Sequence, residues 1–157
     1  MSEWKLPPKA KIYEALSAVA DARVSVLGPT RAQVTSSEGD KVYEVEWNEP
    51  LRAIASNDNA SYWQGYLGYP IVASLLAIHC IEYDPVVAGS LAGIPWKSLN
   101  SEYKRDYDAV VSKVLSDVDA RGGSQSIVVG HVDSIYDQLA ALHLQRLPQR
   151  KPPPKGK

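Results

Sequence analysis

A long uncharged stretch in the middle of the chain constrains its fold more than any other feature. The 22 residues from Ala60 to Ile81 contain no Asp, Glu, Lys or Arg. This is long enough to span the apolar core of a bilayer, which is about 30 Å thick. However, Gly and Pro interrupt the stretch, and it is flanked by Asp58 and Glu82 instead of the positive charge that anchors a cytoplasmic end. We therefore expect the stretch to be buried inside the protein and not in a membrane.

The length and composition predict one globular domain. The chain has 157 residues, of which 45% are hydrophobic, and a chain of this size can bury a core of its own. Its one cysteine, Cys80, excludes an internal disulfide framework, and the first residues lack the apolar run of a signal peptide. We expect a soluble cytoplasmic protein whose domain covers residues 1–145.

Helical periodicity covers most of the chain. Apolar residues recur three and four positions apart in several segments, which are bounded by capping residues, Pro and Gly. The last segment contains Ile127–Val129 before Gly130, which leaves a short strand there as an alternative to a helix. Apolar residues in this segment recur at alternating steps of four and three, as in a coiled coil. This pattern predicts a helix that packs within the chain or forms a homodimer. The expected helices, about five in all, cover residues 9–22, 70–81, 85–93, about 98–121 and 124–146.

Alternation of apolar and polar residues predicts a small antiparallel sheet. Residues 31–36 and 41–47 alternate across the turn residues 37–40, so the two segments form a hairpin with one apolar face and one acidic face. Residues 51–55 are expected to add a third strand. A lone hairpin is marginally stable and must pack on helices. The predicted class is therefore α+β, mostly helical, with the sheet packed on a helical bundle.

The segment from Ser56 to Pro70 is the strongest candidate for a functional site. Its first four residues, which include two amides and a carboxylate, are good helix N-caps, and four aromatic rings and two glycines follow. Aromatic faces stack on planar groups, and a mixed polar and aromatic surface suits ligand sites. The alternative is a capped helix whose rings only fill the core. The candidate ligand-binding or partner-binding residues are Asn57, Asp58, Asn59, Tyr62, Trp63, Tyr66 and Tyr69.

No catalytic or metal-binding signature is present in the sequence. It lacks phosphate-binding glycine motifs, H-E-x-x-H, C-x-x-C and G-x-S-x-G. The three histidines are not spaced as a local metal-binding pair, so we expect no metal and no cofactor. The carboxylate pairs Glu102/Asp106 and Asp133/Asp137 fit solvated helix faces. We therefore predict a non-catalytic binding, adaptor or regulatory domain with a protein partner. The alternative is a small enzyme with an acid–base site at Asp58, on which His131 would converge.

The end of the chain differs in charge from the rest. Residues 146–157 hold five cations and no acid, whereas the other 145 residues hold 12 cations and 18 acids, a net charge of −6. Four prolines in this end predict an extended, disordered tail. Such a tail could contact nucleic acid, although the acidic body argues against binding a duplex. The predicted contact residues of the tail are Arg146, Arg150, Lys151, Lys155 and Lys157.

Overall fold

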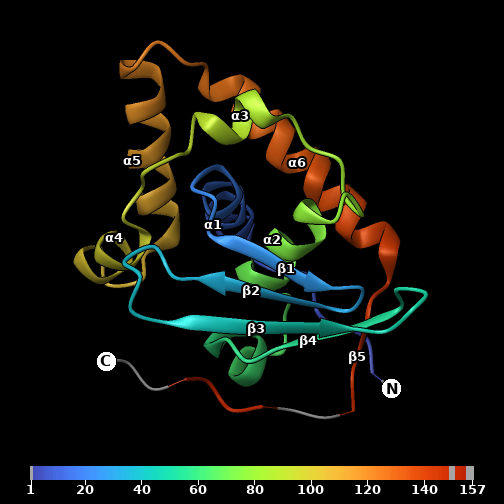
Figure 1. The fold of residues 1–157 in the computed structure, drawn as a ribbon. Helices are drawn as coiled ribbons and strands as arrows, with labels where there is room; N and C mark the ends of the chain where they lie inside the picture. Colours follow the sequence, from blue (N-terminus) through green and yellow to red (C-terminus); the bar gives the residue numbers. More distant parts are fainter. Residues whose placement is uncertain (1, 149–150, 155–157) are drawn as a thin grey trace.

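Helices α1–α6 gather on one face of a five-stranded sheet in the computed structural model, which describes residues 2–148 and 151–154 (Figure 1). The strands follow the order β1-β2-β3-β4-β5 across the sheet. The predicted α+β class is therefore confirmed. The strands are β1 Val24–Gly28, β2 Arg31–Thr35, β3 Val42–Trp47, β4 Ala53–Ser56 and β5 Gln145–Arg146. The helices are α1 Lys9–Ala20, the π-helix η1 Ala60–Gln64, α2 Tyr69–Ala77, α3 Pro85–Gly89, α4 Trp96–Glu102, α5 Tyr107–Ala120 and α6 Gln125–Leu142.

The predicted hairpin is confirmed as strands β2 and β3. They pair antiparallel, with Ala32 opposite Val45 and Val34 opposite Tyr43. These four side chains are buried, while Glu44 alternates with them and points away from the core. β4 pairs antiparallel with β3 and is the expected third strand. The alternation in the sequence thus placed the correct face of this part of the sheet on the helices.

The sheet has two more strands than the sequence predicts. β1 pairs antiparallel with β2 at one edge, but Val26 and Leu27 are each about half exposed, so its sequence carries no clean alternation. β5 is only two residues long and pairs parallel with β4 at the other edge. Two residues are too few to show the alternation of a strand. The partner strand, β4, is far away in sequence, so no local turn signals the pairing.

The apolar second half of the uncharged stretch lies mainly in the core, as predicted, whereas its first half includes exposed side chains such as Trp63. In α2 the side chains from Pro70 to Leu76 are all buried. The helix ends at Ala77 and not at Ile81, because His79 adopts a left-handed backbone conformation with φ +60°. Among residues 2–148 and 151–154, no helix combines the length and the apolar character that crossing a membrane would require.

The predicted helix over about 98–121 is two helices. α4 ends at Glu102 and α5 begins at Tyr107, so Glu102 and Asp106 do not share a helical face as we expected. Lys104 and Arg105 between them have φ of +51° and +63°, which breaks the helical path. The Asp106 side chain instead accepts a hydrogen bond from the backbone N–H of Ala109 and caps α5.

Residues 127–129 belong to the last helix, α6, so the alternative prediction of a short strand there is wrong. The helix ends at Leu142, four residues before the predicted end, because His143 has a φ of +47°. Arg146 therefore lies in β5, where its guanidinium stacks 4.8 Å from the ring centre of Trp4. The indole N–H of Trp4 in turn donates to the Ile54 carbonyl at 2.8 Å. These contacts hold the two ends of the chain beside β4.

Candidate functional site

A cleft of about 650 Å³ opens on the helical side of the sheet, where four parts of the chain meet. One wall comes from α1, one from β3 and the preceding β2–β3 turn, one from η1 and its flanks, and one from α4 and the start of α5. Volumes of this size are typical of small-molecule sites. The lining includes charged, amide and aromatic side chains, among them Lys11, Glu14, Arg23, Asp40, Lys41, Tyr43, Asp58, Asn59, Trp63, Tyr66, Tyr69, Lys97, Asn100, Arg105 and Tyr107.

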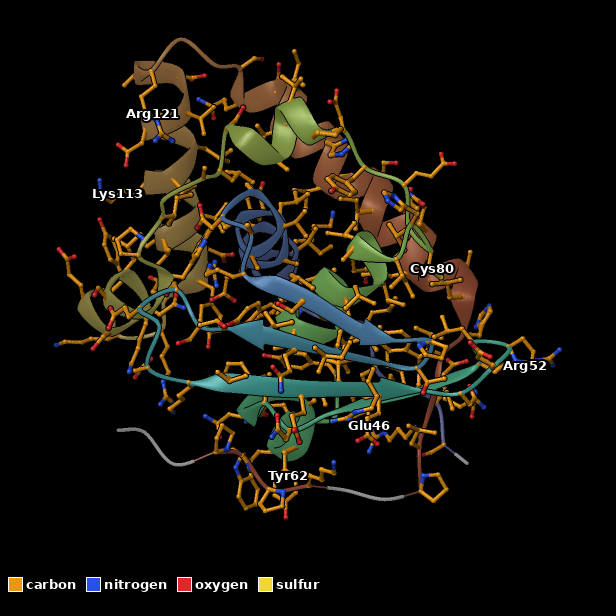
Figure 2. All side chains as sticks on the ribbon, viewed as in Figure 1. Glu46, Arg52, Tyr62, Cys80, Lys113 and Arg121 are labelled. Carbon is orange, nitrogen blue, oxygen red and sulfur yellow. The ribbon has the colours of Figure 1, made fainter. Side chains whose placement is uncertain are left out.

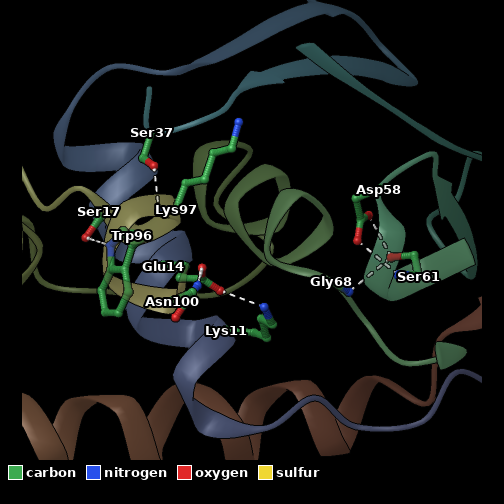
Figure 3. Close-up of polar contacts among 10 residues, drawn as sticks. All are labelled: Lys11, Glu14, Ser17, Ser37, Asp58, Ser61, Gly68, Trp96, Lys97 and Asn100. Carbon is green, nitrogen blue, oxygen red and sulfur yellow. Dashed lines mark hydrogen bonds and ion pairs between the residues drawn. The ribbon is translucent and has the colours of Figure 1, made fainter. Parts of the chain in front are cut away.

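A buried ion pair lies at the floor of the cleft (Figure 3). The Lys11 ammonium is 3.0 Å from a Glu14 carboxylate oxygen, and the other oxygen of Glu14 accepts from the Asn100 amide at 3.1 Å. Burial by itself would lower the pKa of Lys11, but Glu14 and the Tyr107 ring, 4.7 Å from the ammonium, outweigh it and raise that pKa above its ordinary value. Lys11 is therefore held in its charged form.

The carboxylate of Asp58 is buried and is held by hydrogen bonds within its own segment. Its two oxygens accept from the Ser61 backbone N–H at 3.0 Å and from the Ser61 hydroxyl at 2.8 Å. The Ser61 hydroxyl also accepts from the Gly68 N–H at 3.1 Å (Figure 3). A Cβ on Gly68 would lie 2.1 Å from Asp58 Oδ2, so this network requires glycine. Asp58 thus fixes the loop that carries the aromatic side chains.

Tyrosine rings cover the cleft wall between the sheet and α2. Tyr43 and Tyr69 meet edge to face, with ring centres 6.1 Å apart. Burial raises the pKa of Tyr43 to about 12, and it raises the pKa of Tyr69 and, to a smaller extent, of Tyr66. These phenols stay neutral at physiological pH and can donate hydrogen bonds from a largely apolar wall.

The structure brings five of the seven candidate residues to the cleft. Asp58, Asn59, Trp63, Tyr66 and Tyr69 line it. Trp63 is 69% exposed and the three tyrosines of the segment are partly exposed, so the rings do not simply fill the core.

The other two candidates lie apart from the cleft. The Asn57 side chain accepts a hydrogen bond from the Glu44 backbone N–H at 2.8 Å and extends the pairing of β4 with β3. Tyr62 packs edge to face on Trp63, with the ring centres 4.6 Å apart. Neither residue lines the cleft, and Asn57 lines a second hollow beside β3 and β4.

Sequence reasoning missed the opposite walls of the cleft. Lys11 and Glu14 belong to a segment that the sequence marks only as an amphipathic helix, and their spacing of three residues was the one available signal of a pair. Arg105 and Tyr107 reach the cleft because the chain turns between α4 and α5. No local pattern indicates that turn, since both residues fit the predicted continuous helix.

The residues considered for catalysis or metal binding do not gather at the cleft. His131 accepts a hydrogen bond from the Asp84 N–H at 2.8 Å and does not line the cleft with Asp58. Cys80, a candidate nucleophile as the one cysteine of the chain, does not line the cleft, and burial raises the pKa of its thiol, which reduces the fraction of reactive thiolate. Asp133 forms an ion pair with Lys9 at 2.8 Å. In the described part of the chain, no three His, Cys, Asp or Glu side chains are grouped so that they could hold a metal ion.

The cations of the predicted tail lie partly against the sheet. Lys151 contacts Glu46 at 2.8 Å and Glu44 at 3.5 Å on the face opposite the helices, and Glu46 projects toward this C-terminal segment (Figure 2). A second hollow of about 420 Å³ lies between this segment and β3 and β4. Arg146 is held in β5, and its guanidinium donates to the Gly65 carbonyl at 3.0 Å. Three of the predicted contact residues lie outside the described part of the chain: Arg150, Lys155 and Lys157.

Comparison with known proteins places the chain in a family. No curated protein and no solved structure matches it. A family model with the description uncharacterised conserved protein UCP014422 matches residues 4–145. The match covers most of the chain and every residue that lines the cleft. The chain therefore belongs to the family of uncharacterised conserved protein UCP014422.

Proposed function

We propose that this protein is a non-catalytic binding protein whose ligand occupies the cleft between α1, β3, η1 and α4. The convergence of four distant chain segments on one concave, aromatic-lined surface carries this proposal. A cleft of about 650 Å³ is large enough to enclose a small molecule, and aromatic walls with a few fixed polar groups are typical of such sites.

The polar groups of the cleft favour binding over catalysis. A general acid or base needs a carboxylate that can reach a substrate proton. Both oxygens of Asp58 are occupied by Ser61, and Glu14 is shared between Lys11 and Asn100. His131, the expected partner of Asp58 in an enzyme, is bonded to Asp84 elsewhere. These contacts support fixed recognition groups and do not support an acid–base pair.

The shape of the site also bears on the partner class. We predicted a protein partner from the sequence, and flat protein interfaces are larger and less concave than this cleft. The cleft volume favours a small molecule as the primary ligand, and a regulatory or adaptor role would then depend on whether the ligand is bound. Cytoplasmic localisation stays a prediction.

Association with nucleic acid through the tail has weaker support. Of the five tail cations, Arg146 is packed on Trp4 and Lys151 pairs with Glu44 and Glu46 of the same chain. Contacts to phosphate would first have to break these interactions. We therefore retain ligand binding in the cleft as the function to test.

The test is a small-molecule fragment screen followed by NMR of the ¹⁵N-labelled full chain. Binders should shift the amide signals of Asn59, Trp63 and Gly68. Trp63→Ala should weaken these binders because it removes an exposed ring from the cleft rim. Val86→Ala is the matched control, since Val86 is 78% exposed on α3 and does not line the cleft. A screen in which no fragment shifts cleft signals would overturn the proposal.

A further inference from the structure

The cleft is richer in positive charge than the chain as a whole. Its lining contains five cations and three acids, whereas the full chain has a net charge of −1. Such a local excess of one sign raises the concentration of oppositely charged ligands in a concave site. The arrangement of these charges therefore indicates which ligands the cleft attracts.

Four of the eight charged residues that line the cleft form two ion pairs with one another. Lys11 is paired with Glu14, and Lys97 is paired with Asp40, which lowers the pKa of Asp40 to about 2. The third acid, Asp58, is satisfied by Ser61. Ser61 is neutral and does not offset the charge of this carboxylate, but the lining as a whole still has two more cations than acids.

Two cations at the rim remain without an ionic partner. No ion pair within residues 2–148 and 151–154 involves the side chain of Lys41 or of Arg105. Lys41 follows the β2–β3 turn, and Arg105 lies between α4 and α5. The walls that carry them are joined, because Lys97 of α4 donates from its backbone N–H to the Ser37 hydroxyl and from its ammonium to Asp40 (Figure 3 shows the Ser37 contact). The two free cations are thus mounted on connected elements.

A third cation adds positive charge behind the tyrosine wall. Arg23 lines the cleft, and one guanidinium nitrogen donates to the Thr35 carbonyl at 2.8 Å. Its Nε and its other terminal nitrogen are buried and have no hydrogen-bond partner among the residues that the structure describes, and a carboxylate oxygen of Asp21 lies 3.5 Å from Nε. This guanidinium charge is therefore only partly compensated.

We propose that the ligand joins a planar ring to an oxyanion, with the ring against Trp63 and Tyr66 and the oxyanion between Lys41 and Arg105. This inference rests on the proposed function and specifies its ligand class. A carboxylate and a phosphate share the chemistry that Lys and Arg recognise. Tyrosine and tryptophan faces supply the stacking surface for the ring.

The test uses four naphthalene probes that differ in charge, with NMR titration of the full chain. The probes are 1-naphthyl phosphate, 1-naphthoate, neutral 1-naphthol and the cationic 1-naphthylmethylammonium. We expect at least one anionic probe to bind about tenfold more tightly than the cation, and the tighter anion identifies phosphate or carboxylate as the preferred group. Its affinity should fall as salt is raised, whereas that of naphthol should not.

Charge-neutral variants locate the anion site. Lys41→Gln combined with Arg105→Gln should abolish the preference for the anion and leave naphthol binding unchanged. Lys113→Gln combined with Arg121→Gln removes the same charge at α5, outside the cleft, and should keep the preference (Figure 2). Equal affinity of all four probes would overturn the ligand class while leaving the proposed function intact. If no probe binds in the cleft and the fragment screen also fails, both the ligand class and the proposed function are overturned.

Discussion

At the scale of single residues, the pair of Lys11 and Glu14 is the most unusual feature of the molecule. Both side chains are about nine-tenths buried, although they lie on a helix that also carries Ile12 and Leu16 in the core. Taking two charges out of water is costly, and the pair compensates the cost only while both partners are present. A buried charge pair next to a ligand cleft thus gives the floor a fixed polar group at the expense of stability.

Removing one partner should therefore be severely destabilising. Glu14→Gln leaves the Lys11 ammonium buried without its carboxylate, and we expect the free energy of unfolding to fall by about 3–5 kcal/mol. Native Lys11 has a raised pKa, so its contribution to stability is complete below pH 10.5 and is lost as the pH rises through that raised pKa. The deficit of the variant should consequently narrow at alkaline pH. Urea unfolding at pH 7 and at pH 11 measures both effects.

An exposed ion pair provides the control for this variant. Lys113 and Asp117 are 3.1 Å apart on α5 and both are largely exposed. Asp117→Asn should leave the urea midpoint nearly unchanged, because exposed pairs contribute little. If Glu14→Gln were as mild as Asp117→Asn, the buried pair would have no special energetic role.

At the scale of elements, the break between α4 and α5 decides the shape of the cleft. It turns the chain so that Arg105 lines the cleft and the Tyr107 ring lies against the Lys11 ammonium of α1. Two consecutive non-glycine residues, Lys104 and Arg105, adopt left-handed backbone conformations there. Such conformations are unfavourable for residues with a Cβ, so the break stores strain that the surrounding packing must offset.

Relieving this strain should stabilise the protein. Lys104→Gly removes the Cβ at φ +51°, and we expect the free energy of unfolding to rise by up to about 1 kcal/mol. Lys113→Gly makes the same chemical change inside α5, where glycine is unfavourable, and should lower the unfolding midpoint. Thermal and urea unfolding of the two variants would show opposite signs. A midpoint that falls in both would contradict a strained junction.

The sequence was sufficient to predict the helices and strands whose apolar residues repeat with a regular period. It was insufficient where contacts between distant segments determine the local structure. The hairpin of β2 and β3 follows from alternation, and the stripe Val128–Leu139 of α6 follows from helical spacing. The break at Lys104 was missed because neither Lys nor Arg favours a left-handed conformation. The sequence could single out Trp63, Tyr66 and Tyr69 because they lie close together in the chain, whereas Tyr43 and Lys11 join them only through folding.

At the scale of the whole molecule, the sheet separates two surfaces of different charge. The inner face carries the helices and the cleft, with its excess of cations. The outer face presents Glu44 and Glu46, and the C-terminal segment lies along it through Lys151 (Figure 1). The core between the two surfaces is continuous and apolar, from Val45 on the sheet to Leu75 on α2. Removing residues from the outer face of the sheet should therefore leave ligand binding in the cleft unchanged.

Truncation after Pro148 tests this separation. It removes Lys151, whose ion pairs with Glu44 and Glu46 are exposed, so the free energy of unfolding should change by less than about 1 kcal/mol. Fragments and naphthalene probes should bind the truncated chain as they bind the full chain, because Lys151 does not line the cleft. NMR titration of both chains makes the comparison. Loss of binding on truncation would show that the C-terminal segment controls the cleft across the sheet, which would contradict two independent surfaces.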